Sequence, residues 1–312
     1  MERWTFSSGL LTRGHPARGT TPMAVILVFI DGIGIGPPDP EANPFARARA
    51  QWLRAVRGWT PPADGEAPML VPVDACLGVP GLPQSATGQT ALLTGLNAPG
   101  AVGRHVNGFC TTALARLLDG HTLFSRVQAR GGRATFANAY TPSFFEGKRR
   151  FLSVTTVATR GAGLRFRTLE DLRRGEAVFQ DYTNRLLREQ GYEVPVISPE
   201  EAGRRLARLA AQHAFTLYEY FQTDKAGHAQ DMDWAVGLIE GLDRLMRSLL
   251  SQVDLDRTLV CVASDHGNLE DLRTKTHTTN PVPVLLWGRG RETVASRLRD
   301  LTDIAPALLE WT

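Results

Sequence analysis

Two segments near the C-terminus carry side chains that commonly bind metal ions. Asp265 and His266 directly follow the apolar run 258–264, and His277 follows in the segment 276–281. The apolar run predicts a buried parallel strand, whose carboxyl end lies at the edge where open α/β sheets place their active sites. Carboxylate and imidazole groups at this edge indicate a metal site.

Asp224 and His228 repeat this arrangement after a second strand-like run, 216–221. Residues four apart on a helical turn bring their side chains to one point. A lone histidine is more often a satisfied surface or core residue, but Asp-x-x-Gly-His after a strand favours a pair of metal ligands. Mixed carboxylate and imidazole ligands suit Zn²⁺ or Mn²⁺ better than a metal that prefers thiolates.

Asp31 ends the first strand-like run, 24–30, and stands beside Gly32 and Gly34. Alone, it is equally well explained as a turn former or helix cap. The Gly-x-Gly sequence is no dinucleotide fingerprint, because Pro37-Pro38 replaces the required helix start, so nicotinamide cofactors are excluded. Together, three strand ends offer three aspartates and three histidines, which suffice for two divalent ions.

Ser85 is a candidate nucleophile. It stands at the start of a predicted helix within the segment 81–95, where backbone amides can hold an oxyanion and depress the pKa of a hydroxyl. The alternative is a helix N-cap, a role that Thr87 could fill equally well. The residues alone leave both interpretations open.

The elements that must position these residues alternate along the chain. We expect strands at 24–30, 133–139, 216–221, 258–264 and 282–287, and helices at 43–54, 200–212, 234–250 and 302–311. This alternation predicts an α/β sandwich, a mostly parallel central sheet with helices on both faces. The least regular region, at about 141–195, predicts a small insertion over the sheet edge.

The N-terminal segment 1–22 is rich in Gly, Ser, Thr and Arg and lacks the apolar stretch of a secretory signal. We expect it to be a disordered extension before a single domain at 23–312. Met23 stands directly before the first strand and is a candidate for the biological start.

Composition restricts the partners and the compartment. The 35 basic and 32 acidic residues are spread along the chain, without the polybasic footprint of a nucleic-acid binder. No apolar run approaches the ~20 residues that cross a bilayer, so we expect no membrane anchor. Three scattered cysteines do not make a disulfide framework, which fits a cytoplasmic location. The sequence does not indicate an oligomeric state.

Taken in order, the motifs resemble the alkaline phosphatase superfamily. The order is Asp31-Gly, Ser85, Asp224-x-x-Gly-His228, Asp265-His266-Gly-Asn and His277-Thr-Thr-Asn-Pro. The last two are specific for the branch of cofactor-independent phosphoglycerate mutases and phosphopentomutases. The segment from Ser85 to Gly95 also resembles the sulfatase signature of that superfamily, whose spacing favours Ser85 over Thr87 as nucleophile. The matching motifs run from Met23 to the C-terminus, and the middle of the chain is unmatched.

The resemblance implies a three-layer sandwich with two divalent ions, Mn²⁺ or Zn²⁺, and a small phosphorylated metabolite as substrate. It places Asp31, Ser85, Asp265 and His266 around one ion. Asp224, His228 and His277 would hold the other. Ser85 would attack phosphorus and form a phosphoserine, which water or an acceptor hydroxyl then resolves.

Charge on the transferred phosphoryl group also needs cations or amide donors. Arg104 and His105, just past the helix that begins at Ser85, are the first candidates for substrate binding, and Lys148 to Arg150 are the second. For each, a solvated surface charge is the alternative.

Three functions are compatible with these motifs. The first is a metal-dependent phosphoric ester hydrolase. The second is a phosphomutase, although the stretch between Ser85 and Asp224 is far shorter than the second domain of the independent phosphoglycerate mutases. The third is an inactive ligand-binding relative, which the intact ligand set disfavours. A sulfatase is disfavoured further, because Thr87 and Gln89 replace residues that its maturation signature requires.

Overall fold

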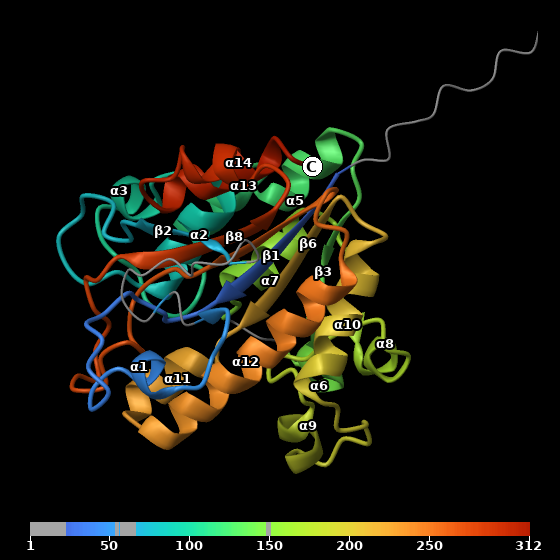
Figure 1. The fold of residues 1–312 in the computed structure, drawn as a ribbon. Coiled ribbons are helices and arrows are strands. Elements are labelled where there is room, and N and C mark those ends of the chain that lie inside the picture. Colours follow the sequence, from blue (N-terminus) through green and yellow to red (C-terminus); the bar gives the residue numbers. More distant parts are fainter. Residues whose placement is uncertain (1–22, 54–55, 57–66, 148–150) are drawn as a thin grey trace, which may run out of the picture.

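A six-stranded sheet with helices on both faces forms the body of the molecule (Figure 1). The computed structural model describes residues 23–53, 56, 67–147 and 151–312. The strand order is β2-β8-β7-β1-β6-β3; β8 runs antiparallel to both neighbours, and the other pairs are parallel. This confirms the expected α/β class. The strands are β1 (Ala24–Ile30), β2 (Met69–Val73), β3 (Ala134–Phe136), β6 (Phe215–Tyr220), β7 (Thr258–Ala263) and β8 (Val282–Gly288).

Strand β1 divides two apolar cores. Val25, Leu27 and Phe29 belong to one core, whereas the alternate residues Ile26, Val28 and Ile30 belong to the other. Successive strand side chains point to opposite faces of the sheet. A continuous apolar run therefore needs helices on both faces, which is why this strand is central.

The helices fall into two layers that match the two cores. The layer over the Leu27 face contains α2 (Ser85–Thr94), α3 (Ala98–Val102), α4 (Thr112–Leu118), α5 (Leu123–Ala129), α7 (Val154–Gly161), α13 (Arg291–Ala295) and α14 (Ile304–Leu309), the last preceded by a 3₁₀ turn at Leu301–Asp303. The opposite layer contains α1 (Pro44–Arg47), α10 (Pro199–Ala210), α11 (Gln222–Ala229) and α12 (Met232–Gln252).

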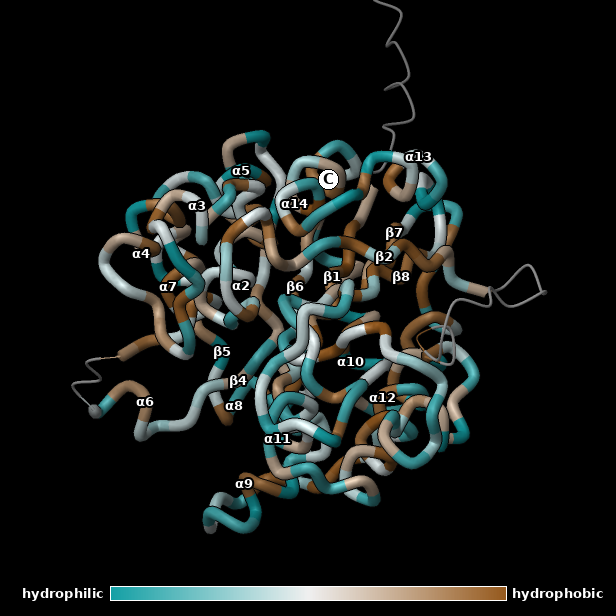
Figure 2. The backbone as a smooth tube through the Cα atoms, turned by 90° about the vertical axis from the view of Figure 1, so that its left-hand side faces the viewer, coloured by the Kyte–Doolittle hydropathy of each residue, from teal (hydrophilic) through white to brown (hydrophobic). Residues whose placement is uncertain are grey.

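Apart from α7, which packs on the sheet, the helices of the region 141–195 lie to one side of the sheet (Figure 2). This region contains α6 (Pro142–Glu146), α8 (Leu169–Arg173) and α9 (Arg185–Glu189), and a short parallel pair of strands, β4 (Ala139–Tyr140) and β5 (Arg167–Thr168), joins it to the body. Leu172, Phe179 and Leu187 belong to a small apolar cluster separate from the two main cores. Its division from the rest as an insertion stays a prediction.

Two expected elements differ from the structure. The helix expected at 43–54 begins with Asn43 as its N-cap, as expected, but ends at Arg47. The backbone of Ala48 is extended. The amides of Trp52 and Leu53 donate to Asp243 on α12 instead of continuing the helix. The strand expected at 133–139 is broken into β3 and β4. The edge strand β2 was not expected at all.

Two expectations concern residues outside those described: the segment 1–22, expected to be a disordered extension, and the basic run Lys148 to Arg150. Among the helices of the described residues, none has the length and apolar character needed to span a bilayer.

Candidate active site

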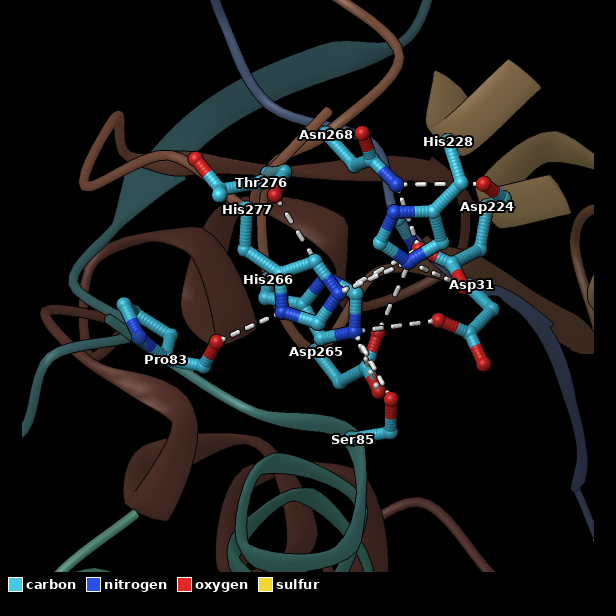
Figure 3. A network of polar contacts seen from close by, with 12 residues as sticks. Asp31, Pro83, Ser85, Asp224, His228, Asp265, His266, Asn268, Thr276 and His277 are labelled. Carbon is cyan, nitrogen blue, oxygen red and sulfur yellow. Dashed lines mark hydrogen bonds and ion pairs between the residues drawn. The ribbon is translucent and has the colours of Figure 1, made fainter. Parts of the chain in front are cut away.

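The predicted ligands gather at one edge of the sheet, where the parallel strands end (Figure 3). Asp31 follows β1, Asp265 and His266 follow β7, and Asp224 lies in the first turn of α11, directly after β6. Because β8 is antiparallel, the loop that enters it returns to the same edge. A bridge between Gly267 and Thr278 holds this loop, and with it the intervening His277, against the end of β7.

One set of converging ligand atoms comes from Asp224, His228 and His277, all lying within 4.8 Å of one another. His228 Nε2 lies 3.3 Å from Asp224 Oδ2 and 3.3 Å from His277 Nε2. His277 Nε2 lies 3.5 Å from Asp224 Oδ1. This is the trio that the resemblance assigned to one ion.

A second set of converging atoms comes from Asp31, Asp224 and His266. His266 Nε2 lies 3.2 Å from Asp31 Oδ1 and 3.6 Å from Asp265 Oδ2. The structure thus gathers all of the residues that the sequence grouped around the other ion, but Asp224 takes part in both sets. A carboxylate with two oxygens suits such a shared position.

Backbone carbonyls orient the three imidazoles. His277 Nδ1 lies 2.8 Å from the carbonyl of Pro83, and His228 Nδ1 lies 2.7 Å from that of Lys275. His266 Nδ1 has a longer contact of 3.4 Å with the carbonyl of Gly267. A proton on Nδ1 that is donated to a carbonyl leaves Nε2 as the ligand atom, and this is the usual support for a metal-binding histidine.

Buried negative charge dominates the electrostatics of this edge. Burial raises the pKa of Asp265 well above its ordinary value and also raises that of Asp31. Burial opposes protonation of His266, but the carboxylates of Asp265 and Asp31 outweigh it and raise the pKa of the imidazole to about 10. Asp31 Oδ1 is buried, and its polar neighbour is His266 Nε2 at 3.2 Å. Converging buried carboxylates fit divalent cations.

Ser85 is the first residue of α2, and its Oγ lies 3.0 Å from His266 Nε2 (Figure 3). Helix α2 packs closely against the segment that follows β7. A Cβ on Gly88 would lie only 2.7 Å from the carbonyl oxygen of Asp265. Thr87 is turned to other partners: its Oγ1 donates to the carbonyl of Gln84 and accepts from the amide of Val106. Of the two hydroxyls, the one on Ser85 meets the predicted ligands.

Two residues of the site were missed as functional from the sequence. Gln89 Nε2 lies 3.3 Å from both Asp31 Oδ2 and Asp265 Oδ2, one helical turn after Ser85, and that spacing was the available signal. Glu219 is a charged residue in the otherwise apolar strand β6. Burial raises the pKa of its carboxyl to about 7, and the negative charge of Asp31 adds to the rise. The hydrogen bond that Thr155 donates to this carboxylate acts in the opposite direction and lowers the pKa.

Glu270 connects the loops that carry the ligands and was also missed. Its carboxylate accepts from the backbone amides of Gly34 and Asn268 and from the side chains of Thr278 and Asn280. These partners come from the segments that follow β1, follow β7 and precede β8. A Cβ on Gly34 would lie 2.2 Å from Glu270 Oε1, so only glycine leaves room for the carboxylate there.

The expected substrate-binding residues are not among those that line the cavity of about 660 Å³ beside Asp31 and Ser85. Arg104 is exposed, and His105 makes a ring contact of 3.2 Å with the carbonyl of Val79. The role of these two residues in substrate binding stays a prediction.

Comparison of the sequence with known families gives partial matches. Residues 195–311 match the model described as the Metalloenzyme superfamily. Relatives include the 2,3-bisphosphoglycerate-independent phosphoglycerate mutases of Gloeothece citriformis, 33% identical over 134 residues, and Methanopyrus kandleri, 36% identical over 89 residues. These matches cover 38% and 27% of this chain and 25% and 21% of the relatives, so the chain spans about a quarter of the length of the relatives it matches.

Solved structures match over nearly the whole chain. The alkaline phosphatase of the Antarctic bacterium TAB5 has a TM-score of 0.55 at 14% identity, with 94% of this chain and 99% of that chain covered. For the alkaline phosphatase of Thermus thermophilus the TM-score is 0.53 at 16% identity, with 97% and 95% covered. Identities this low show the fold alone.

The C-terminal part of the chain, residues 195–311, thus resembles the Metalloenzyme superfamily, and the whole chain has an alkaline phosphatase-like fold. Its sequence likeness lies with the 2,3-bisphosphoglycerate-independent phosphoglycerate mutases. The resemblance inferred from the motifs is confirmed.

Proposed function

We propose that this protein is a metal-dependent hydrolase of small phosphoric monoesters that acts through a phosphoserine on Ser85. The observation that carries the proposal is the contact of 3.0 Å between Ser85 Oγ and His266 Nε2, at the centre of the converging carboxylates and imidazoles. A nucleophile held among metal-ligand side chains at a helix N-terminus is an arrangement suited to phosphoryl transfer.

Two divalent ions, Mn²⁺ or Zn²⁺, would be held by the two sets of side chains. Asp224, His228 and His277 would hold one, and Asp31, Asp265 and His266 the other, with Asp224 positioned to share. When bound, such ions supply Lewis acidity that offsets charge on the phosphoryl oxygens and lowers the pKa of a serine hydroxyl. Gln89 keeps Asp31 and Asp265 in place by donating to both.

The role of Ser85 in the proposed reaction is covalent. Its Oγ attacks phosphorus, the Oγ–P bond forms, and the bond from phosphorus to the alcohol oxygen of the substrate breaks. Water then attacks the phosphoserine and releases inorganic phosphate. The positive end of the α2 dipole lies at Ser85 and favours the negative charge of the phosphoryl group.

Access of solvent favours hydrolysis over a mutase reaction. A mutase must retain its dephosphorylated intermediate, which favours an enclosing element. Here the cavity beside Ser85 is bordered by Phe109 and Phe151, which are 55% and 60% exposed. The second candidate, a phosphomutase, is favoured by the sequence likeness to phosphoglycerate mutases.

Phosphate release from an aryl phosphate, measured with Mn²⁺ or Zn²⁺ and with a chelator, tests the proposal. Turnover should require the metal. Ser85→Ala should abolish it, by several orders of magnitude, because the attacking oxygen is lost. The matched control Thr87→Ala removes a hydroxyl two residues away and should cost at most ~0.5–2 kcal/mol of stability, as for a lost cap.

The remaining outcomes separate the alternatives. Phosphoryl transfer to an added alcohol without release of phosphate would identify a mutase. Absence of both release and transfer with either metal would contradict the proposal and favour a ligand-binding relative.

A further inference from the structure

The cavity beside the candidate nucleophile is lined by residues of the candidate metal site and by aromatic rings. Asp31, Ser85, Gln89 and Asp224 belong to the site. The aromatic rings that line the same cavity, beside polar side chains such as Asn138 and Gln180, include those of Phe109, Tyr140, Phe144, Phe151, Phe179 and Phe221. A monoester whose phosphate lies at the candidate metal site would have these rings within the same cavity for its alcohol half.

The aromatic rings at the cavity form two contacting groups. In one group, Tyr140 and Phe144 have their ring centroids 4.4 Å apart, and the ring of Phe166 packs against that of Tyr140 at 4.9 Å. In the other group, Phe109 and Phe151 are stacked with centroids 5.7 Å apart. Each group is therefore preformed, which lowers the cost of ordering it around a ligand.

Exposed apolar side chains are concentrated at this cavity. Five large apolar side chains are exposed in the part of the chain that the structure describes. Two of them, Phe109 and Phe151, line this cavity, and a third, Phe145, contacts its wall through Phe144. Concentrated exposure of apolar side chains at a cavity marks a binding site more often than scattered exposure does.

Positive charge in the wall is sparse. Among the described residues that line the cavity, Lys225 is the one cationic side chain, and its Nζ lies 4.9 Å from the ring centroid of Phe221. Glu219, Asp31 and Asp224 line the same cavity. Recognition of a substrate carboxylate or a second phosphate uses clustered arginines or lysines, which this part of the wall does not offer.

We propose that the alcohol half of the substrate is apolar, an aryl or alkyl group that binds against the Tyr140, Phe144, Phe109 and Phe151 rings. This inference rests on the proposed function, because it names the substrate class of the same site. The region 141–195 then has a function: it brings Phe144, Phe151 and Phe179 to the cavity and so selects the ester.

Two alkyl phosphates with similar leaving groups, ethyl phosphate and hexyl phosphate, test the inference on the Mn²⁺-loaded enzyme. The longer chain adds apolar contact without changing the reacting bond. We expect kcat/KM to be about 10- to 100-fold higher for hexyl phosphate, given the usual value of buried methylenes. 3-Phosphoglycerate, with its added carboxylate, should be no better than ethyl phosphate.

Variants of adjacent residues on α6 make a matched pair. Phe144→Ala removes a ring from the cavity wall and should reduce the hexyl-to-ethyl ratio of kcat/KM about 5-fold or more. Phe145→Ala removes a neighbouring ring that does not line the cavity and should leave the ratio unchanged. Phe109→Ala, at an exposed position away from α6, should reduce the ratio without depending on the folding of that helix.

The outcomes distinguish this inference from the proposed function. Three results would overturn the inference even if the protein releases phosphate. They are equal kcat/KM for the two alkyl phosphates, a preference for 3-phosphoglycerate, and an unchanged hexyl-to-ethyl ratio in both Phe144→Ala and Phe109→Ala. Absence of release from every ester would overturn the proposed function and the inference with it.

Discussion

The hydrogen bond between Ser85 and His266 depends on the protonation of the imidazole. Without a bound cation, the carboxylates of Asp265 and Asp31 outweigh burial and raise the pKa of His266, whose Nε2 lies 3.2 Å from Asp31 Oδ1 and 3.0 Å from Ser85 Oγ. A divalent ion that binds Nε2 must displace the proton held there. Metal binding therefore replaces these contacts of His266 with a metal–ligand bond.

Glu219 gives a prediction about stability. Its carboxyl has an ordinary pKa of 4.5 and a folded-state pKa of about 7, caused first by burial. Between these values the unfolded chain binds fewer protons, so the free energy of unfolding falls as pH rises through this window. The penalty above pH 7 is roughly 3 kcal/mol at about 1.4 kcal/mol per pKa unit. Glu219→Gln removes the ionisable group and should therefore stabilise the chelator-treated protein at pH 8 but not at pH 4.

Urea unfolding at both pH values measures this difference. Glu41→Gln, which removes the same charge from an exposed position, is the control and should change neither value. Equal destabilisation by Glu219→Gln at both pH values would show that ionising this carboxyl does not lower the stability of the folded state. The raised pKa assigned to Glu219 would then be wrong.

At the scale of elements, Glu270 connects the segments that follow β1, follow β7 and precede β8, and these segments carry Asp31, His266 and His277. Glu270→Gln keeps the size of the side chain but places an amide donor against the donors of Gly34 and Asn268. We expect a 10- to 100-fold weaker affinity for Mn²⁺, roughly the usual effect of losing a residue that supports metal ligands.

Titration of the metal-depleted protein with Mn²⁺ checks this prediction. Asp271→Asn changes the adjacent residue, whose carboxylate pairs with Arg273 at the surface, and should bind Mn²⁺ as the native protein does. Native affinity in Glu270→Gln would show that the loops hold their positions without this carboxylate.

The strands that position the site could be predicted because they are buried on both faces. Strands β1, β6 and β7 are near-continuous apolar runs, and the expected bounds lie within one residue of those observed. Strand β2 could not be predicted, because it is a partly exposed edge strand with a proline, Pro72, inside it. The helix expected at 43–54 stops early because tertiary bonds to Asp243 capture the chain.

The site was predictable where its residues follow strands or belong to recognisable motifs. Asp31, Asp224 and Asp265 were predicted because strand ends meet at one edge of a parallel sheet, and Ser85, His228 and His277 because they stand in motifs. Gln89 stands one helical turn after Ser85, but the carboxylates to which it donates are far away in the chain. Glu270 lies inside a loop, and no spacing in the sequence indicates its distant partner Gly34.

At the scale of the whole molecule, the two sets of converging side chains predict two divalent ions per chain. His277 belongs to one set and has no contact below 4 Å with the carboxylates of the other except through the shared Asp224. His277→Ala should therefore leave about one tightly bound ion, because it opens one coordination position in the Asp224–His228 set.

Elemental analysis of metal-reconstituted protein tests this stoichiometry. His121→Ala, which removes an exposed imidazole, is the control and should retain two ions. One ion or fewer in the native protein, or two retained in His277→Ala, would contradict the assignment of the two sets.

The central claim, covalent catalysis by Ser85, is tested most directly by trapping the intermediate. The Mn²⁺-loaded protein is mixed briefly with substrate, quenched in acid, digested and examined by peptide mass spectrometry. The account predicts one phosphate on Ser85, absent from Ser85→Ala and unaffected by Thr87→Ala. A phosphate on Thr87, or near-normal turnover in Ser85→Ala, would contradict it.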